Sequence, residues 1–261
     1  MNKNIVINVY DIFGMKIRET TMGKRMIDIH NHSLFAVDDG AKDMEESVEM
    51  LRHAYAKGVE AVILTPHYRH GMFAYPKERI TENYKALSVE AEKIGIGLYL
   101  GCEYHVDSDI VDAFTSGRCA ALAGGDYVLT EYSYGTEYGV MLQYTRQLVS
   151  CGYIPVIAHV ERYACIQKKP KLCGELSDLG AYIQMNADSV LGIDGRQLEH
   201  VCRKLLKGGF ADMIGSDAHG VHQRQSHLGQ CYEYVLKKYG EADADRLFYK
   251  NAKRVLENAA D

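Results

Sequence analysis

The sequence predicts an α/β fold in which seven strand-then-helix units form a parallel barrel. Short apolar segments of strand length alternate along the chain with longer segments that have helical periodicity. This alternation is typical of a parallel sheet covered by helices, and right-handed crossovers repeated seven times most naturally close such a sheet into a barrel. Functional side chains of a barrel lie at the carboxyl ends of its strands, so a site is expected there.

The first predicted strand, residues 26–32, alternates apolar and polar residues and ends in a His-x-His pair. Residues two apart on a strand point to the same face, so His30 and His32 project together and can bind one metal ion. Such a pair alone arises often by chance. It gains weight because the later strands also end in, or lead into, polar residues; these strands are predicted at 61–67, 98–103, 126–131, 154–159, 181–186 and 212–219.

The helices are predicted from apolar periodicity and from residues that begin or end helices. Asp43 is the expected N-cap of the first helix, with Glu46 three residues later, and Gly58 ends that helix after Lys57. The remaining helices are predicted near residues 77–94, 108–116, 138–150, 169–179, 196–207, 226–239 and 241–257.

The chain has 261 residues, of which 47% are hydrophobic and 25% charged, as in ordinary globular proteins. Without a Pro-, Gly- or Ser-rich linker, residues 26–261 are expected to form one domain, preceded by an extension of unknown role at 1–25. The net charge of −5 argues against nucleic acid binding, and no apolar run is long enough to span a membrane. Seven cysteines without Cys-x-x-Cys spacing favour free thiols in a reducing cytoplasm.

A barrel would bring five histidines and four carboxylates together at one rim. These nine residues end the strands or follow them closely: His30, His32, Asp39, His67, Glu103, Glu131, His159, Asp217 and His219. So many ionisable groups in one pocket need cations, and nine ligands are too many for one ion, so two or three divalent metals are expected. Imidazole and carboxylate ligands suit Zn²⁺, Mn²⁺ or Fe, and spacing alone does not choose among them.

A site with two or three metals is best suited to phosphoester hydrolysis, because the metals stabilise the attacking and leaving oxygens and make hydroxide from bound water. Arg162 and Arg224 follow strands at the same rim, and a guanidinium matches the geometry of phosphate oxygens. A phosphatase mechanism through a cysteinyl phosphate is excluded, because no cysteine is followed by arginine at the Cys-x₅-Arg spacing.

Six motifs carry a resemblance to a known family: Asp28-Ile29-His30-Asn31-His32, Asp38-Asp39-Gly40-Ala41-Lys42, Thr65-Pro66-His67-Tyr68, Gly101-Cys102-Glu103, Ala158-His159-Val160-Glu161-Arg162-Tyr163 and Ser216-Asp217-Ala218-His219. In this order they resemble the PHP (polymerase and histidinol phosphatase) superfamily, and within it the bacterial capsule-associated, manganese-dependent protein-tyrosine phosphatases. The resemblance covers nearly all of residues 26–257. It implies a distorted (β/α)₇ TIM-like barrel, a trinuclear metal centre, and dephosphorylation of a bacterial tyrosine kinase that regulates polysaccharide export.

The resemblance also implies a role for each rim residue. It makes His30, His32, Glu103 and Asp217 ligands of one metal, places Glu103, Glu131 and His159 around a second, and makes Asp39, His67 and His219 ligands of a third. Arg162 and Arg224 correspond to the phosphate-binding pair. The sequence departs from the family pattern at Val160, where proline is usual, and at Tyr132-Ser133, which stand in place of an aromatic–proline pair.

Other functions remain open at this point. A small-molecule phosphatase of the same superfamily, such as a histidinol-phosphatase, or a nuclease-like phosphodiesterase would use similar metals. A catalytically silent barrel acting as a scaffold would lack ligands, whereas here all nine positions are filled. The sequence does not decide whether His105, near the rim, contacts the site. Four tyrosines near the rim would either flank an aromatic substrate or pack within loops: Tyr68, Tyr132, Tyr134 and Tyr163.

Overall fold

The computed structural model describes residues 25–259. The predicted extension at 1–25 therefore lies outside the described residues, apart from Arg25. The guanidinium of Arg25 lies 3.3 Å from the Glu60 carboxylate and 4.3 Å from the centre of the Tyr249 ring. These contacts attach the start of the first strand to the second strand and to the C-terminal helices.

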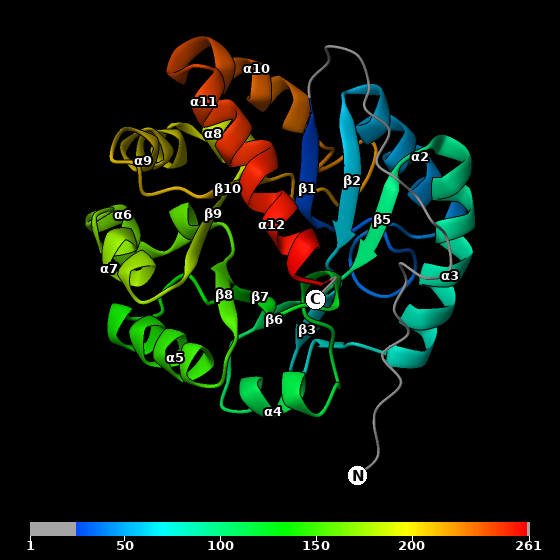
Figure 1. Ribbon diagram of the computed structural model, residues 1–261, viewed down its shortest axis with the longest axis horizontal. Coiled ribbons are helices and arrows are strands. Elements are labelled where there is room, and N and C mark those ends of the chain that lie inside the picture. Colours follow the sequence, from blue (N-terminus) through cyan, green and yellow to red (C-terminus); the bar gives the residue numbers. More distant parts are fainter. Residues whose placement is uncertain (1–24, 260–261) are drawn as a thin grey trace.

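Two mainly parallel sheets form the centre of the molecule, with helices around them (Figure 1). The smaller sheet has the strand order β1-β2-β5, and the larger has the order β10-β9-β8-β7-β6-β3-β4. Within the described residues, only β4 runs antiparallel to its neighbour, β3. The strands are β1 (Met26–Asn31), β2 (Val59–Leu64), β3 (His67–Arg69), β4 (Phe73–Ala74), β5 (Gly97–Leu100), β6 (Glu103–His105), β7 (Tyr127–Glu131), β8 (Ile154–Ile157), β9 (Tyr182–Asn186) and β10 (Met213–Gly215).

The predicted helices are confirmed, with ends that shift by up to three residues. Asp43 is the N-cap predicted for the first helix, and its carboxylate accepts a hydrogen bond from the Glu46 N–H at 2.9 Å. The helices are α2 (Met44–Ala56), α3 (Lys77–Ile94), α4 (Ile110–Thr115), α5 (Tyr138–Ser150), α6 (Ala164–Lys168), α7 (Leu172–Asp178), α8 (Ala187–Leu191), α9 (Arg196–Lys207), α10 (Leu228–Tyr239), α11 (Glu241–Asp245) and α12 (Asn251–Asn258). Short 3₁₀ turns, η1 (Leu122–Gly124) and η2 (Val160–Arg162), and a π-helical turn, η3 (Arg246–Lys250), complete the chain.

Two of the predicted strands are each divided into a pair of shorter strands. The segment 61–67 becomes β2 and β3, because Pro66 has no N–H to donate to a ladder, and 98–103 becomes β5 and β6 around Gly101. The two divided strands stay paired through the break, since the Gly101 N–H donates to the Leu64 carbonyl at 2.8 Å and the Glu103 N–H to the Pro66 carbonyl at 3.2 Å. On the other side, the Asp217 N–H donates to the His30 carbonyl at 2.8 Å. Backbone hydrogen bonds therefore join the two sheets between β1 and the end of β10, and the two divided strands connect them on the other side.

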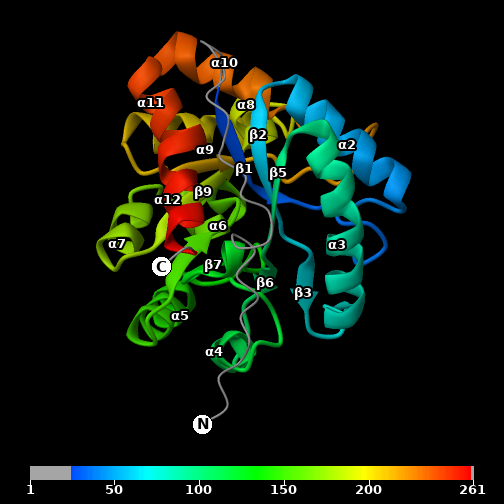
Figure 2. The same cartoon turned by 45° about the vertical axis from the view of Figure 1, so that its right-hand side comes forward.

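Helices pack against the sheets on more than one side. Figure 2 shows α2 and α3 as an outer layer beside β2 and β5. In Figure 1 the C-terminal helix α12 crosses in front of the strands. Its buried side chains Val255 and Ala252 belong to an apolar cluster that also contains Ile29 of β1, Ile63 of β2 and Leu129 of β7. The last helix therefore forms part of the core. No helix within residues 25–259 has the length and apolar character needed to cross a membrane.

The role of α12 in the core predicts a large effect of Val255→Ala on stability. Val255 is fully buried, so removing two methyl groups leaves a cavity and lowers the free energy of unfolding by about 2 kcal/mol. The matched control is Val89→Ala on α3, where the side chain is 53% exposed and helix propensity changes equally. Urea unfolding measures both, and equal midpoints for the two variants would contradict the packing of α12.

Candidate metal centre

The nine predicted rim residues come together, seven of them at or after the carboxyl ends of strands and two, His67 and Glu103, at the breaks in the divided strands. His30 lies on β1, His67 begins β3, Glu103 begins β6 and Glu131 ends β7, while the others follow strands in short loops. Parallel pairing places His67 and Glu103 side by side, because His67 lies opposite Glu103 in the β3–β6 ladder. Contacts of 2.9–3.7 Å between imidazole and carboxylate atoms connect all nine side chains into one cluster.

Glu103 is the central residue of this cluster. Its fully buried carboxylate lies 3.1 Å from His30 Nε2, 3.3 Å from His32 Nε2 and 3.0 Å from His67 Nδ1 through Oε2. The other oxygen, Oε1, lies 2.9 Å from His159 Nε2. Burial alone would raise the pKa of Glu103, but the histidines outweigh it and hold that pKa well below its usual range. The group is therefore a carboxylate held by imidazoles from several strands.

Glu103 belongs to a set of four residues whose ligand atoms lie close together: His30, His32, Glu103 and Asp217. Asp217 Oδ1 lies 3.4 Å from His30 Nε2 and 3.5 Å from His32 Nε2, and both histidines also contact Glu103. These four atoms lie within 4.8 Å of one another, all from buried residues. Two imidazoles and two carboxylates at this spacing are able to hold one divalent ion.

Two further groups lie beside the first. Glu131 Oε1 lies 3.7 Å from His159 Nε2, and Glu131 also belongs to a compact set of ligand atoms with His67 and Glu103. The other group contains Asp39, His67 and His219. Asp39 Oδ1 lies 3.4 Å from His67 Nε2 and 3.5 Å from His219 Nε2. His67 therefore stands between the two groups, which the sequence did not indicate.

Hydrogen bonds orient the histidine rings from outside the cluster. Asp38 Oδ2 lies 2.8 Å from His32 Nδ1, and Gln184 Oε1 lies 3.3 Å from His30 Nδ1. The Asp217 carbonyl lies 2.8 Å from His219 Nδ1. Each of these oxygens accepts, so each Nδ1 carries a proton and Nε2 is the ring nitrogen that faces the cluster and can bind a metal once it is deprotonated.

The donor set fits divalent ions by a further criterion. Five buried atoms of the cluster make no hydrogen bond within the described residues, although buried polar atoms are almost always paired. They are His30 Nε2, His32 Nε2, His67 Nδ1, Glu103 Oε2 and His219 Nε2. A cation between these atoms would satisfy all of them, so the cluster is suited to bind metal.

Both predicted arginines reach Asp217 at the edge of the cluster. Arg162 Nη1 lies 3.1 Å from Asp217 Oδ2, and Arg224 Nη2 lies 3.4 Å from Asp217 Oδ1. Arg224 also lies 3.4 Å from Asp39 Oδ2. Burial works against the charge of Arg162, but Asp217 and Glu161 raise its pKa above the usual value, so the guanidinium stays charged.

The cluster opens into a cleft of about 560 Å³. Metal-binding candidates and both arginines line its floor and walls, together with apolar side chains: Met72, Phe73, Tyr134 and Leu198. Of the four rim tyrosines, only Tyr134 lines this cleft, and it is 65% exposed. Tyr132 and Tyr163 are buried in the core, and Tyr68 packs edge-on against Tyr104. His105 Nε2 instead lies 3.1 Å from Ser133 Oγ, away from the cleft lining.

Three residues of the site have backbone angles in the left-handed region. The φ angles are 32° at His159, 52° at Asp217 and 50° at Arg224, and residues other than glycine rarely adopt such values. Such conformations cost roughly 1–3 kcal/mol each and persist where surrounding contacts fix them. Here the His159 N–H donates to Gln184 Oε1 at 2.7 Å, and the Asp217 N–H donates to the His30 carbonyl.

Sequence reasoning missed three residues that matter to the site. Asp38 was visible beside Asp39 in the turn after the first strand, yet nothing in the spacing shows that Asp38 faces His32. Gln184 has no chemical signature, although it lies on a predicted strand. Arg69 lies two residues after His67, so the alternation of a strand could have placed it on the same face.

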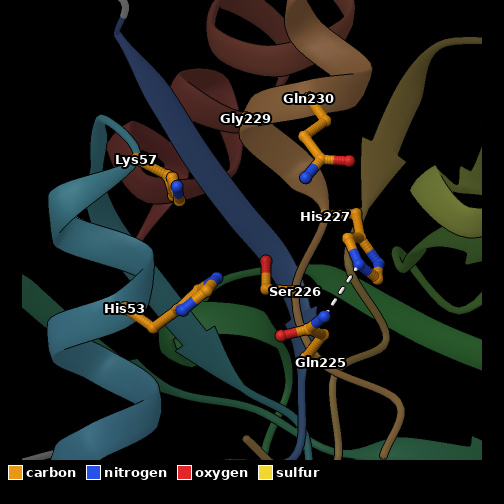
Figure 3. Close-up of a pocket in the computed structure, with 7 residues that line it drawn as sticks. All are labelled: His53, Lys57, Gln225, Ser226, His227, Gly229 and Gln230. Carbon is orange, nitrogen blue, oxygen red and sulfur yellow. Dashed lines mark hydrogen bonds between the residues drawn. The ribbon is translucent and has the colours of Figure 1, made fainter. Parts of the chain in front are cut away.

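A second, much smaller pocket lies outside the cluster, between α2 and the start of α10 (Figure 3). His53, Lys57 and His227 line it. His227 is already paired, with Nε2 3.1 Å from Gln225 and Nδ1 2.9 Å from Asp188. These histidines contribute no ligand to the cluster.

Comparison with known proteins agrees with this geometry. The family described as capsular polysaccharide synthesis, CpsB/CapC, matches residues 26–257. The tyrosine-protein phosphatase CpsB of Streptococcus pneumoniae is 32% identical over 238 residues, covering 88% of this chain and 98% of that protein. The tyrosine-protein phosphatase YwqE of Bacillus subtilis is 33% identical over 237 residues, covering 89% of this chain and 92% of that protein.

Solved structures show the same relationship. A structure from the work on YwqE from Bacillus subtilis and CpsB from Streptococcus pneumoniae, described as unique metal-dependent tyrosine phosphatases, superposes with a TM-score of 0.83 and 31% identity. It covers 89% of this chain and 95% of that chain. An organophosphorus hydrolase variant, at 13% identity and a TM-score of 0.59, shows that the α/β fold is similar to phosphotriesterase-like TIM barrels. The chain belongs to the CpsB/CapC family of capsular polysaccharide synthesis.

Proposed function

We propose that this protein is a metal-dependent protein-tyrosine phosphatase. The observation that carries the proposal is the cluster of buried imidazole and carboxylate atoms that make no hydrogen bond within the described residues, in a cleft that Arg162 and Arg224 also line. Family membership supports it, because the relatives are named tyrosine-protein phosphatases and the structural neighbour is described as metal-dependent. A scaffold without catalysis would not need a complete ligand set or the arginines.

The nine ligands divide into three sites in this proposal. His30, His32, Glu103 and Asp217 form the first; Glu103, Glu131 and His159 the second; Asp39, His67 and His219 the third. Glu103 would contribute to both of the first two sites, since its carboxylate contacts histidines of each. His67 also faces the second group, so it is placed to share that role.

The residues of the chain have distinct roles in the proposed reaction. Bound divalent metals supply a Lewis acid for the phosphoryl oxygens and lower the pKa of water. Arg162 and Arg224 bind the phosphate and offset the charge that develops on its oxygens. Asp38 and Gln184 keep the imidazoles of His32 and His30 in the orientation that ligation needs. A phenolate is a good leaving group, so the reaction has little need of a general acid.

Four finer statements extend this proposal. The metal is manganese, and iron or zinc would fit the same imidazole and carboxylate ligands. The substrate is a phosphotyrosine protein, a bacterial tyrosine kinase of capsule synthesis, which the family description supports. The seven free thiols favour the cytoplasm as its location. The two sheets act as one distorted (β/α)₇ barrel within residues 26–259, supported by the hydrogen bonds between β1 and the end of β10 and by the two strands that continue from one sheet into the other.

Activity on a phosphotyrosine peptide with added Mn²⁺ tests the proposal. His30→Ala removes a ligand and is expected to lower metal content and to reduce kcat/KM on the order of a hundredfold or more. Arg162→Ala is expected to retain the metals but to lose roughly a hundredfold in kcat/KM, because one charged donor to the phosphate is gone. Steady-state kinetics and metal analysis of the same samples separate the two effects.

Neighbouring residues on α2 provide matched controls. His53→Ala and Arg52→Ala make the same chemical changes outside the cleft and should leave both readouts unchanged. The proposal fails if wild-type protein with Mn²⁺ hydrolyses histidinol phosphate far faster than phosphotyrosine peptides. It also fails if no divalent ion binds and no activity appears.

Metal binding is also expected to release protons. Burial would lower the pKa of His30 and His32, but Glu103, Asp217 and Asp38 outweigh it, so both pKa values are raised in the protein without metal. Below those raised pKa values the imidazoles carry protons that a metal must displace, so metal affinity should increase with pH. Titration calorimetry in buffers of different ionisation enthalpy measures the release, and heats that do not depend on the buffer would contradict it.

A further inference from the structure

Three arginines line the cleft, but only two of them are held by carboxylates. Arg162 and Arg224 both contact Asp217. The third, Arg69, is half-buried, and its guanidinium makes no hydrogen bond, ion pair or ring contact with any residue in the range 25–259. A partly buried cation without a partner is unfavourable, so this position favours an anion that the chain itself does not supply.

The strand geometry directs Arg69 into the cleft. Arg69 is two residues from His67 on β3, so the two side chains share one face, and both line the cleft. Tyr68, between them, points to the other face and packs edge-on against Tyr104 at a ring distance of 4.9 Å. β3 is held on both sides, by β6 and by β4, which fixes this alternation.

Sheet order places Arg69 near Glu131. β3 pairs with β6, where Tyr68 lies opposite Tyr104, and β6 pairs with β7, where His105 lies opposite Glu131. Arg69 and Glu131 both line the cleft. Arg69 therefore lies on the side of the cleft that carries Glu131, whereas Arg162 and Arg224 contact Asp217.

We propose that Arg69 binds a phosphate oxygen of the substrate from the side of the cleft that carries Glu131. This role rests on the phosphatase function proposed above and adds a third cationic contact to the reacting group. A transferring phosphoryl group spreads its charge over three oxygens, so cations on both sides of it stabilise the transition state better than a pair on one side.

The main competing role is recognition of an acidic side chain next to the phosphotyrosine. Position along β3 favours the phosphate. Arg69 lies two residues, about 7 Å, beyond His67, and an arginine side chain is long enough to reach back over that distance. Arg69 also shares its strand face with His67, a candidate metal ligand that lines the same cleft.

The test uses Arg69→Gln and Arg69→Lys in the manganese-loaded protein, with Arg52→Gln on α2 as the control. Substrates are p-nitrophenyl phosphate and two phosphotyrosine peptides, one with acidic and one with neutral flanking residues. A second readout is the affinity for inorganic phosphate measured by titration calorimetry, and a third is metal content.

Arg69→Gln is expected to lower kcat/KM by a similar factor on all three substrates, roughly ten- to a hundredfold, and to weaken phosphate binding. Arg69→Lys keeps the charge but loses the planar fork, so it should recover only part of both losses. Metal content should stay at the wild-type level, and Arg52→Gln should match wild type throughout.

Three outcomes would overturn the proposal. A loss of kcat/KM confined to the acidic peptide would assign Arg69 to recognition of flanking residues. An unchanged phosphate affinity in Arg69→Gln would show that Arg69 does not contact the phosphate. A fall in metal content would show that Arg69 acts by positioning Glu131. If wild-type protein binds phosphate but hydrolyses no phosphotyrosine, the proposed function fails while the calorimetric comparison still decides the role of Arg69.

Discussion

A single buried carboxylate, Glu103, determines how the ends of the strands are arranged. A carboxylate removed from water needs cationic or hydrogen-bonding partners, and among residues 25–259 the ion-pair partners of Glu103 are imidazoles. His30 and His32 approach from the smaller sheet and His67 and His159 from the larger one. The charge of Glu103 therefore links the two sheets, and any shift of one strand against its neighbours would leave that charge unpaired in the interior.

Much of this site could be predicted because its residues follow simple periodic rules. The spacing of His30 and His32 fixes a common face, and parallel strands end at one edge, so ligands far apart in sequence could be grouped in advance. Asp38 and Gln184 could not be predicted in the same way. Their role depends on the direction in which a loop carboxylate and a strand amide point after folding, and short-range sequence pattern does not record that direction.

The order of strands and helices was predicted from the sequence, but the breaks that divide two of the strands were not. Apolar runs such as 61–67 predict one strand, and the structure divides that run because Pro66 cannot donate a hydrogen bond. The second division, at Gly101, has a packing cause. A Cβ at Gly101 would lie 2.8 Å from Leu122, so the chain passes too close to η1 for a larger residue. Contacts between distant segments decide such details, and a single sequence does not display them.

The strained backbone at the site follows from the same contacts. His159 and Asp217 lie at positive φ, which has an energetic cost that the fold must offset. Gln184 provides part of the offset, because its side-chain oxygen accepts from the His159 N–H while facing His30 Nδ1. Its amide nitrogen donates to the Met185 carbonyl at 2.7 Å, which leaves the oxygen fixed as an acceptor. One neutral side chain thus positions two histidines from different sheets, so part of the ligand arrangement depends on hydrogen bonds within the protein itself.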